Sequence, residues 1–224
     1  LNRSVTIRDL LTHTSGFTYG IFSQTPVDTL YREAQVLRGG DSLSQAITRL
    51  SKIPLLNQPG ETWHYSVSTD ILGYLVEQLS GLTLAEFVEE NILQPLNMND
   101  TGFEVADNDL NRFTVNYQVQ EDGSLKAIDG GKKSQFAAPV TFYSGGGGMV
   151  STADDYMRFA HMLLNGGEYD GVRLLSPKTI EFMTQNHLGR EFEPGWGFGL
   201  GFRVNVDLAK SKILGSEGTY DWSG

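Results

Sequence analysis

The spacing of apolar residues predicts several amphipathic helices. In residues 69–80 the apolar side chains recur three or four positions apart, and Gly81 follows as a stop signal, with Ser68 or Thr69 as the expected cap. Further helices are predicted over residues 7–11, 44–50, 83–92, 152–164 and 176–183. Most of these begin at a residue whose hydroxyl can cap a helix, namely Thr6, Thr83, Thr152 and Ser176.

Alternation of apolar and polar residues predicts fewer strands. Residues 113–119 alternate, and Asp122-Gly123 then turns the chain into residues 125–128, a pattern typical of a β-hairpin. Residues 199–206 alternate again, and residues 212–214 are expected to pair with them. The pattern indicates a mixed α+β chain, with a mainly helical lobe over 1–110 and a hairpin, helices and sheet strands over 111–224.

Composition and charge narrow the class of protein. The 224 residues are 39% hydrophobic and 20% charged, as in a folded globular chain. The net charge of −10 argues against nucleic acid or an anionic membrane as the main partner. No segment approaches the roughly 18–20 apolar residues of a membrane span. The absence of cysteine excludes disulfides, thiol nucleophiles and thiolate metal sites, but leaves the cellular compartment undecided.

Several common catalytic motifs are missing. No serine lies within Gly-x-Ser-x-Gly, which excludes the usual nucleophile turn of α/β-hydrolases. The four histidines form no His-Glu-x-x-His motif, which argues against a zinc hydrolase. Lys133 stands where a phosphate-binding loop needs Ser or Thr, and the glycines of 197–201 precede a predicted strand instead of following one. Residues 107–111 begin like a calcium loop, but Arg112 occupies the position of its required glycine.

Five segments remain that carry distinctive residues in a fixed order. They are Leu-Leu-Thr-His-Thr-Ser-Gly at 10–16, Pro-Gly-Glu-Thr-Trp-His-Tyr-Ser-Val at 59–67, Gly-Gly-Met-Val-Ser-Thr at 147–152, Gly-Trp-Gly-Phe-Gly-Leu-Gly at 195–201, and Trp-Ser-Gly at 222–224. Together they resemble the serine β-lactamase and penicillin-binding protein superfamily, in its class C-like branch of family VIII carboxylesterases. The resemblance implies an α/β sandwich, with an antiparallel sheet flanked by helices beside a mostly helical lobe. We expect residues 1–224 to be one such domain, incomplete at both ends.

The resemblance also implies a chemistry. Enzymes of this superfamily transfer acyl groups through a serine in Ser-x-x-Lys, while that lysine and a second-motif tyrosine move the proton. Tyr65 matches this tyrosine, and Trp222, Ser223 and Gly224 match the third motif, which lines the substrate site. A phenol with a pKa of about 10 is only about a thousandth ionised at pH 7, so Tyr65 needs a cation or a proton relay beside it. Without the resemblance, Tyr65 would be interpreted as a half-buried structural aromatic residue.

Two departures from the family pattern favour neutral ester substrates. Val67 stands where β-lactamases carry an asparagine, whose amide is offered to the side chain of the substrate and which valine cannot replace. Trp222 stands where Lys or His usually binds the substrate carboxylate, and its indole is an uncharged donor. We therefore predict an esterase acting on small ester or amide substrates, with a β-lactamase or D-alanyl carboxypeptidase as the alternative. Simple core packing is the alternative role for Trp222.

The nucleophile motif itself is missing. None of the seven lysines has a serine three residues before it. Because the motif precedes the 10–16 segment in the family, we expect it upstream of Leu1 and expect the 224-residue chain alone to be inactive. A non-catalytic scaffold with the same fold is the competing interpretation. No metal or organic cofactor is implied, and self-association is compatible with the sequence but cannot be derived from it.

Three further motifs are expected to be structural. His13 lies in a segment that forms a turn in the family, so we expect no catalytic role for it. The glycines of 145–148 are expected to permit tight packing at the floor of the site, in preference to holding an anion. The alternating glycines of 195–201 are expected to let a strand approach neighbouring backbone closely.

Overall fold

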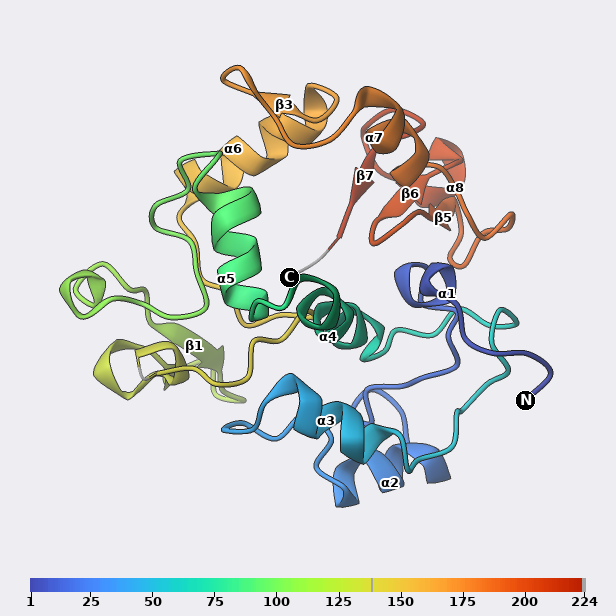
Figure 1. Ribbon diagram of the computed structural model, residues 1–224, viewed down its shortest axis with the longest axis horizontal. Helices are drawn as coiled ribbons and strands as arrows, with labels where there is room; N and C mark the ends of the chain where they lie inside the picture. Colours follow the sequence, from blue (N-terminus) through green and yellow to red (C-terminus); the bar gives the residue numbers. More distant parts are fainter. Residues whose placement is uncertain (138, 223–224) are drawn as a thin grey trace.

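Helix α4 (Ser68–Ser80) is the element around which the chain is arranged. The computed structural model describes residues 1–137 and 139–222. The other helices and the strands follow one another around α4 in the view of Figure 1. Helices α1 (Ile7–Leu11), α3 (Leu43–Leu50) and α5 (Leu84–Val88) contact α4 directly. The remaining helical elements are α2 (Pro26–Glu33), the π-helical turn η1 (Glu89–Leu93), the 3₁₀ turns η2 (Asp107–Asp109), η3 (Gly131–Lys133) and η4 (Gln135–Ala137), α6 (Ala153–Leu164), α7 (Pro177–Met183) and α8 (Leu208–Ser211).

Hydroxyl caps start most of these helices. Thr6, Thr25, Ser42 and Thr83 each form a capping box at the start of α1, α2, α3 and α5. Helix α4 is different, because its N-cap is Val67 and no side chain caps it, so the expected cap at Ser68 or Thr69 is wrong. The predicted stop is confirmed, since Gly81 adopts a left-handed conformation with φ of 76°.

The strands form three small antiparallel sheets. The predicted hairpin is confirmed as β1 (Asn116–Val119) paired with β2 (Leu125–Asp129) across Asp122-Gly123. A second pair joins β3 (Glu168–Tyr169) to β4 (Val172–Arg173), and a third sheet has the order β5 (Trp196–Phe198), β6 (Arg203–Asn205), β7 (Tyr220–Asp221). Residues 212–214 do not pair with β6 as expected. These residues follow α8, whose N-terminus is capped by the Asp207 side chain. The place beside β6 is taken by β7.

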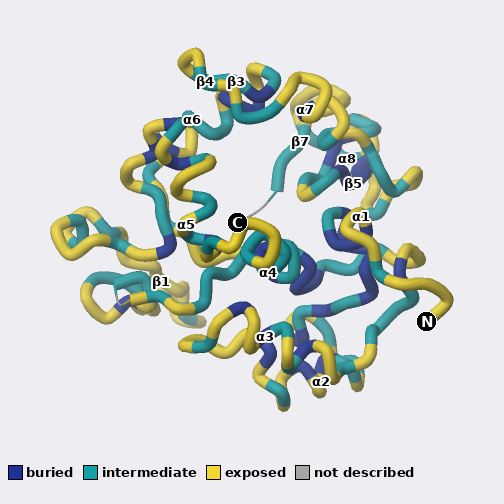
Figure 2. The backbone as a smooth tube through the Cα atoms, viewed as in Figure 1, coloured by how far each residue is buried: buried dark blue, intermediate teal, exposed yellow. Residues whose placement is uncertain are grey.

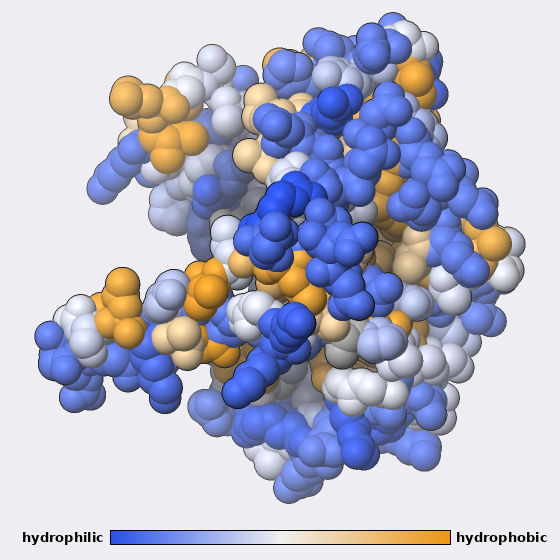
Figure 3. Space-filling model, turned by 90° about the vertical axis from the view of Figure 1, so that its left-hand side faces the viewer, coloured by the Kyte–Doolittle hydropathy of each residue, from blue (hydrophilic) through white to orange (hydrophobic). Residues whose placement is uncertain are grey.

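The core consists of three apolar clusters. The first cluster joins side chains of α6 and α7 to the 93–98 segment. The second joins α2 and α3 to Val67, and the third consists of Leu43, Leu84 and Phe103. Figure 2 shows buried positions around α1 and α3, whereas the β1–β2 hairpin is exposed along nearly its whole length. On the side of the molecule shown in Figure 3, apolar and polar side chains are interleaved at the surface. No single helix in the described ranges is long and apolar enough to cross a membrane, although α4 and the 84–93 helix, bent by 82°, meet that test as a pair.

Candidate active site

The loop that carries Tyr65 is fastened to the turn after α1. The backbone N–H of His64 donates to the carbonyl of His13 at 2.8 Å, and that of Gly60 donates to the carbonyl of Thr14 at 2.7 Å. The first two motif segments are therefore one structural unit, although about fifty residues separate them in the sequence. This unit fixes where the Tyr65 ring lies.

Tyr65 and Trp222 lie side by side, as the motifs predict for two residues of one site. Their ring centroids are 5.3 Å apart. Trp222 follows directly after β7, which runs from the rim of the molecule toward α4 in Figure 1. Both rings also face His13, whose centroid is 5.0 Å from that of Tyr65 and 6.3 Å from that of Trp222. The N-terminal turn, the second motif and the last described strand thus converge on one aromatic cluster.

The other predicted site residues have different positions. Val67 is only 1% exposed and packs in the core cluster with Tyr31, Val36 and Leu50, so it offers almost no surface to a ligand. Ser223 and Gly224 lie outside the described residues. Of the predicted site residues, Tyr65 and Trp222 are therefore in contact with each other, whereas Val67 is buried in the core.

Sequence reasoning missed Tyr19. Its ring centroid is 5.0 Å from that of Tyr65, and its ring is also in edge contact with Phe22 at 5.6 Å. Burial raises the pKa of Tyr19 well above its usual range, and the Asp70 carboxylate and the Tyr65 side chain add to this. The available signal was its position only three residues after the Leu-Leu-Thr-His-Thr-Ser-Gly motif.

A chain of buried hydroxyl groups supports the site from behind. Ser68 hydrogen-bonds to Ser15 at 2.7 Å and to Ser66 at 2.8 Å, and all three serines are fully buried. The His13 Nδ1 lies 3.4 Å from the Ser66 hydroxyl. Burial, together with the nearby His64, lowers the pKa of His13 to about 4, so its imidazole is neutral at physiological pH. These contacts make His13 part of the scaffold.

The glycine-rich segment packs on α4, in line with the expectation of tight packing. A Cβ on Gly145 would lie 2.2 Å from the Thr69 carbonyl oxygen, so only glycine fits there. The Ser144 hydroxyl donates to the Asp70 Oδ1 at 2.5 Å, and the Gly146 N–H donates to the same oxygen at 3.3 Å. The alternating glycines near β5 also approach neighbouring groups closely, since a Cβ on Gly199 would lie 2.3 Å from the Met183 carbonyl oxygen.

A cavity of about 410 Å³ opens beside Tyr19. Aromatic and aliphatic side chains supply much of its wall, among them Leu37, Phe103, Phe136, Val140 and Phe142. Its other lining residues are uncharged as well, and the glycine-rich segment forms one side. The space next to the Tyr65 site therefore suits a neutral, largely apolar group.

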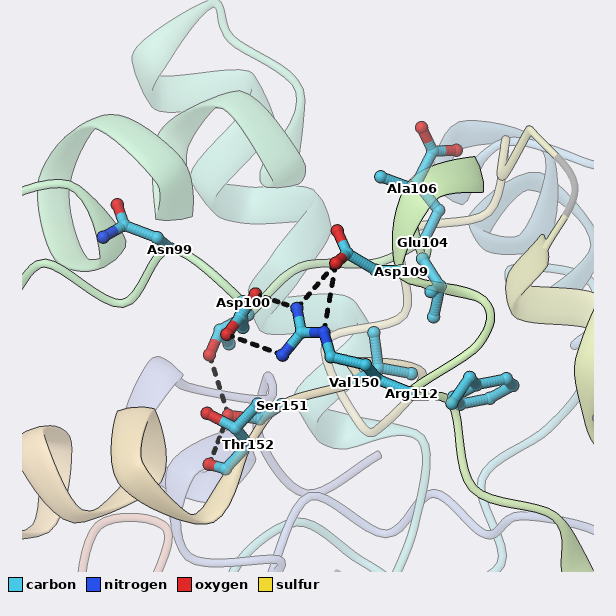
Figure 4. Close-up of a pocket in the computed structure, with 12 residues that line it drawn as sticks. Asn99, Asp100, Glu104, Ala106, Asp109, Arg112, Val150, Ser151 and Thr152 are labelled. Carbon is cyan, nitrogen blue, oxygen red and sulfur yellow. Dashed lines mark hydrogen bonds and ion pairs between the residues drawn. The ribbon is translucent and has the colours of Figure 1, made fainter.

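A smaller cavity of about 160 Å³ has a structural character (Figure 4). Arg112 lies between Asp100 and Asp109, and its guanidinium donates to their carboxylates at 2.5 and 2.7 Å. The Asp100 N–H in turn donates to Asp155 in the first turn of α6 at 2.8 Å. The ion pairs of Arg112 and the hydrogen bond from Asp100 to Asp155 thus hold the 99–112 segment against α6. Among the described residues, no three His, Asp or Glu side chains gather as metal ligands.

Comparison with known proteins gives consistent matches over nearly the whole chain. Residues 2–224 match the family model described as Beta-lactamase. Protein Rv1367c of Mycobacterium tuberculosis is 37% identical over 235 residues, which cover 99% of this chain and 57% of that protein. Esterase EstB of Burkholderia gladioli is 33% identical over 243 residues, which cover 98% of this chain and 59% of the esterase.

A solved structure of a hydrolase also matches the fold of nearly the whole chain. The protein described as "EstCE1, a hydrolase with promiscuous acyltransferase activity" superimposes with a TM-score of 0.81 at 28% identity. The match covers 96% of this chain and 60% of that chain. The chain therefore spans less than two thirds of the length of these relatives.

Proposed function

Because this chain belongs to the Beta-lactamase family, as its motifs predicted, we propose that it is part of a serine hydrolase that cleaves small neutral esters through an acyl-serine intermediate. The contact between Tyr65 and Trp222 carries this proposal, since it joins the second and third motifs of the family in one site. Esterase EstB and EstCE1 support the choice of acyl chemistry by what their names say of them.

The preference for neutral esters rests on the charges of the site. Trp222 offers an indole N–H where the family's lysine or histidine would attract a carboxylate. The cavity beside Tyr19 is lined by uncharged residues. A β-lactam or a D-alanyl peptide would have to desolvate its carboxylate here without a counter-charge, which is costly. An ester with an apolar acyl chain carries no such penalty.

The proposed reaction has two acyl-transfer steps. The serine of a Ser-x-x-Lys motif upstream of residue 1 attacks the ester carbonyl, and Tyr65, with that motif's lysine, accepts the serine proton. The proton then passes to the alcohol as the C–O bond breaks. In the second step water attacks the acyl-serine and gives its proton to the same pair. The pair passes this proton to the serine oxygen as the acyl C–O bond breaks, which releases the acid and regenerates the serine hydroxyl.

The test compares two substrates with the full-length protein. We expect turnover of p-nitrophenyl butyrate, no turnover of nitrocefin, and a loss of about 100-fold or more in kcat for Tyr65→Phe. Turnover of nitrocefin alone would favour the β-lactamase alternative. Intact-mass analysis with a fluorophosphonate probe should label the full-length protein and leave the 224-residue chain unlabelled. A full-length protein that resists the probe and cleaves neither substrate would support the non-catalytic scaffold.

A further inference from the structure

We propose that Asp70 is a positioning residue that sets the acyl-chain preference of this site, because its buried carboxylate holds the glycine-rich segment 144–148 as a fixed wall of the cavity beside Tyr19. The proposal rests on the function proposed above and adds the substrate class, namely esters whose acyl chain is longer than acetyl. Three observations carry it: the place of the cavity, the composition of the segment, and the hydrogen bonds that Asp70 accepts.

The cavity begins next to the predicted catalytic tyrosine. The ring of Tyr19 lines the cavity, and its centroid lies 5.0 Å from that of Tyr65. Beyond this point the walls include Phe136 and Phe142 on one part and residues 144 and 146–148 on another. An acyl chain is the part of a small neutral ester that suits such an apolar space.

The glycine-rich segment carries few groups that could hold it in place. Residues 145–148 are all glycine, the residue type with the greatest backbone freedom. A Cβ on Gly147 would meet no atom within 4 Å, so this residue borders open space. The far end is fixed by backbone hydrogen bonds between Val150 and Gly102, at 2.8 and 3.1 Å. The near end therefore needs an anchor outside the segment.

Asp70 on α4 supplies this anchor. It is only 2% exposed, and its Oδ1 accepts the Ser144 hydroxyl at 2.5 Å and the Gly146 N–H at 3.3 Å. The backbone lies close beneath these bonds, since a Cβ on Gly73 of α4 would lie 3.4 Å from the Gly145 Cα. Hydrogen bonds to a carboxylate are stronger than those between neutral groups. They fix the chain just before the residues that line the cavity.

The second oxygen of Asp70 limits what the wall can be made of. A Cβ on Gly146 would lie 3.0 Å from the Asp70 Oδ2, so a side chain at this position would displace either the carboxylate or the wall. Burial raises the pKa of Asp70, which shows that keeping a carboxylate here has a cost that an apolar residue would not have. That cost is explained if the carboxylate shapes the site as well as the fold.

The central test is Asp70→Ala in the full-length protein, assayed on p-nitrophenyl hexanoate and p-nitrophenyl acetate. We expect the ratio of kcat/KM for hexanoate to that for acetate to fall about 10-fold, the effect of losing the contacts of about one methylene group. Acetate has the shortest chain in the cavity, so its kcat/KM should change less than about threefold. Asp70→Asn should restore the wild-type ratio, because its amide oxygen can accept both hydrogen bonds.

A second pair of variants removes single hydroxyl groups and leaves the buried carboxylate in place. Ser144→Ala should lower the same ratio about 3- to 5-fold, because it removes one of the two hydrogen bonds to Oδ1. Ser151→Ala is the matched control, since its hydroxyl bonds Thr101 at 2.7 Å beyond the far end of the segment, and the ratio should not change.

The outcomes separate this inference from the proposed function. An unchanged ratio in both Asp70→Ala and Ser144→Ala, or an equal loss on both esters, would overturn the role of Asp70 in chain preference. If Asp70→Ala does not fold, Ser144→Ala decides the question. The proposed function fails independently if the wild-type protein cleaves neither ester or if Tyr65→Phe is fully active.

Discussion

At the scale of single residues, we expect Trp222 to decide which substrates the proposed site can accept. Its ring centroid lies 5.3 Å from that of Tyr65, with the planes tilted by 59°, and 5.2 Å from that of the buried Phe198, so its indole is held within the aromatic cluster. A neutral donor at this position can orient a carbonyl group but contributes little to the binding of a carboxylate. The identity of this one side chain should therefore set the preference between neutral and acidic esters.

Trp222→Lys should shift this preference. We expect kcat/KM for mono-p-nitrophenyl succinate to rise about 10-fold relative to p-nitrophenyl butyrate, because one charge-assisted hydrogen bond is worth about 1.5–3 kcal/mol. Trp222→Phe should leave the ratio of the two substrates unchanged, since it adds no charge. Assays of the full-length variants on both esters measure the ratio, and an unchanged ratio in Trp222→Lys would contradict the assignment.

His13 should make the stability of the protein depend on pH. Its folded-state pKa of about 4 lies below the value of 6.5 for a free imidazole, so the unfolded chain binds more protons between these pH values. The free energy of unfolding should therefore fall as the pH drops from 6.5 toward 4, by up to about 3 kcal/mol. Urea titrations at several pH values measure this.

The matched variant for that measurement is His13→Asn. His13 has a φ of 52°, and asparagine tolerates this left-handed conformation better than most residues. The variant should lose most of the dependence between pH 6.5 and pH 4. If His13→Asn retains the full slope, another group is responsible for it.

At the scale of elements, α2 shows how one buried carboxylate orders a loop and a helix together. Asp28 is fully buried and accepts hydrogen bonds from Thr18, Ser23 and both the N–H and the hydroxyl of Thr25. It therefore caps α2 and also fixes the loop that carries Tyr19. The Thr-Pro-Val-Asp pattern at 25–28 carries a capping signal, with proline at the first helical position, yet the sequence analysis did not predict this helix.

Asp28→Ala should therefore destabilise the protein by about 2–4 kcal/mol, because it leaves several buried hydroxyl donors without an acceptor. Chemical denaturation of the 224-residue chain measures the change. Asp122→Ala is the comparison, since Asp122 is an exposed turn residue and should cost less than about 1 kcal/mol. Equal losses in the two variants would argue against a special role for the Asp28 network.

Local patterns explain which elements could be predicted. Helices with hydroxyl caps and the Asp-Gly hairpin are specified by residues close in sequence, and they form where predicted. The pairing of β6 with β7 is set by long-range contacts, so local alternation suggested the wrong partner at 212–214. The absence of a side-chain cap on α4 has a similar cause, because Val67 is buried in the core at the position where the helix begins.

At the scale of the whole molecule, the candidate site depends on contacts between distant segments. Motif order predicted that Tyr65 and Trp222 would meet, but the place of Tyr19 depends on how the 18–20 loop packs, which no short pattern specifies. Phe198 on β5 is completely buried and contacts His13, Trp63 and Trp222. It links the turn after α1, the Tyr65 loop and the end of β7.

Phe198→Ala should therefore weaken the whole fold as well as the site. We expect a loss of about 3–5 kcal/mol in the free energy of unfolding, the range for removing a buried aromatic ring. Phe182→Ala, at a position that is 50% exposed, should cost much less. Guanidinium titrations of both variants provide the comparison, and a loss below 1 kcal/mol in Phe198→Ala would show that the cluster is not a central part of the core.

The aromatic cluster also has an optical consequence. Tyr65 and Trp222 are far closer than the distance over which tyrosine passes excitation energy to tryptophan, and the His13 ring lies against both. Trp63 is so near Tyr65 in the sequence that it accepts this energy in any state of the chain, so the effect of docking has to be measured in a Trp63→Phe variant. There, emission from Trp222 excited through tyrosine should rise, without any added dye, when the two halves of the site come together during refolding.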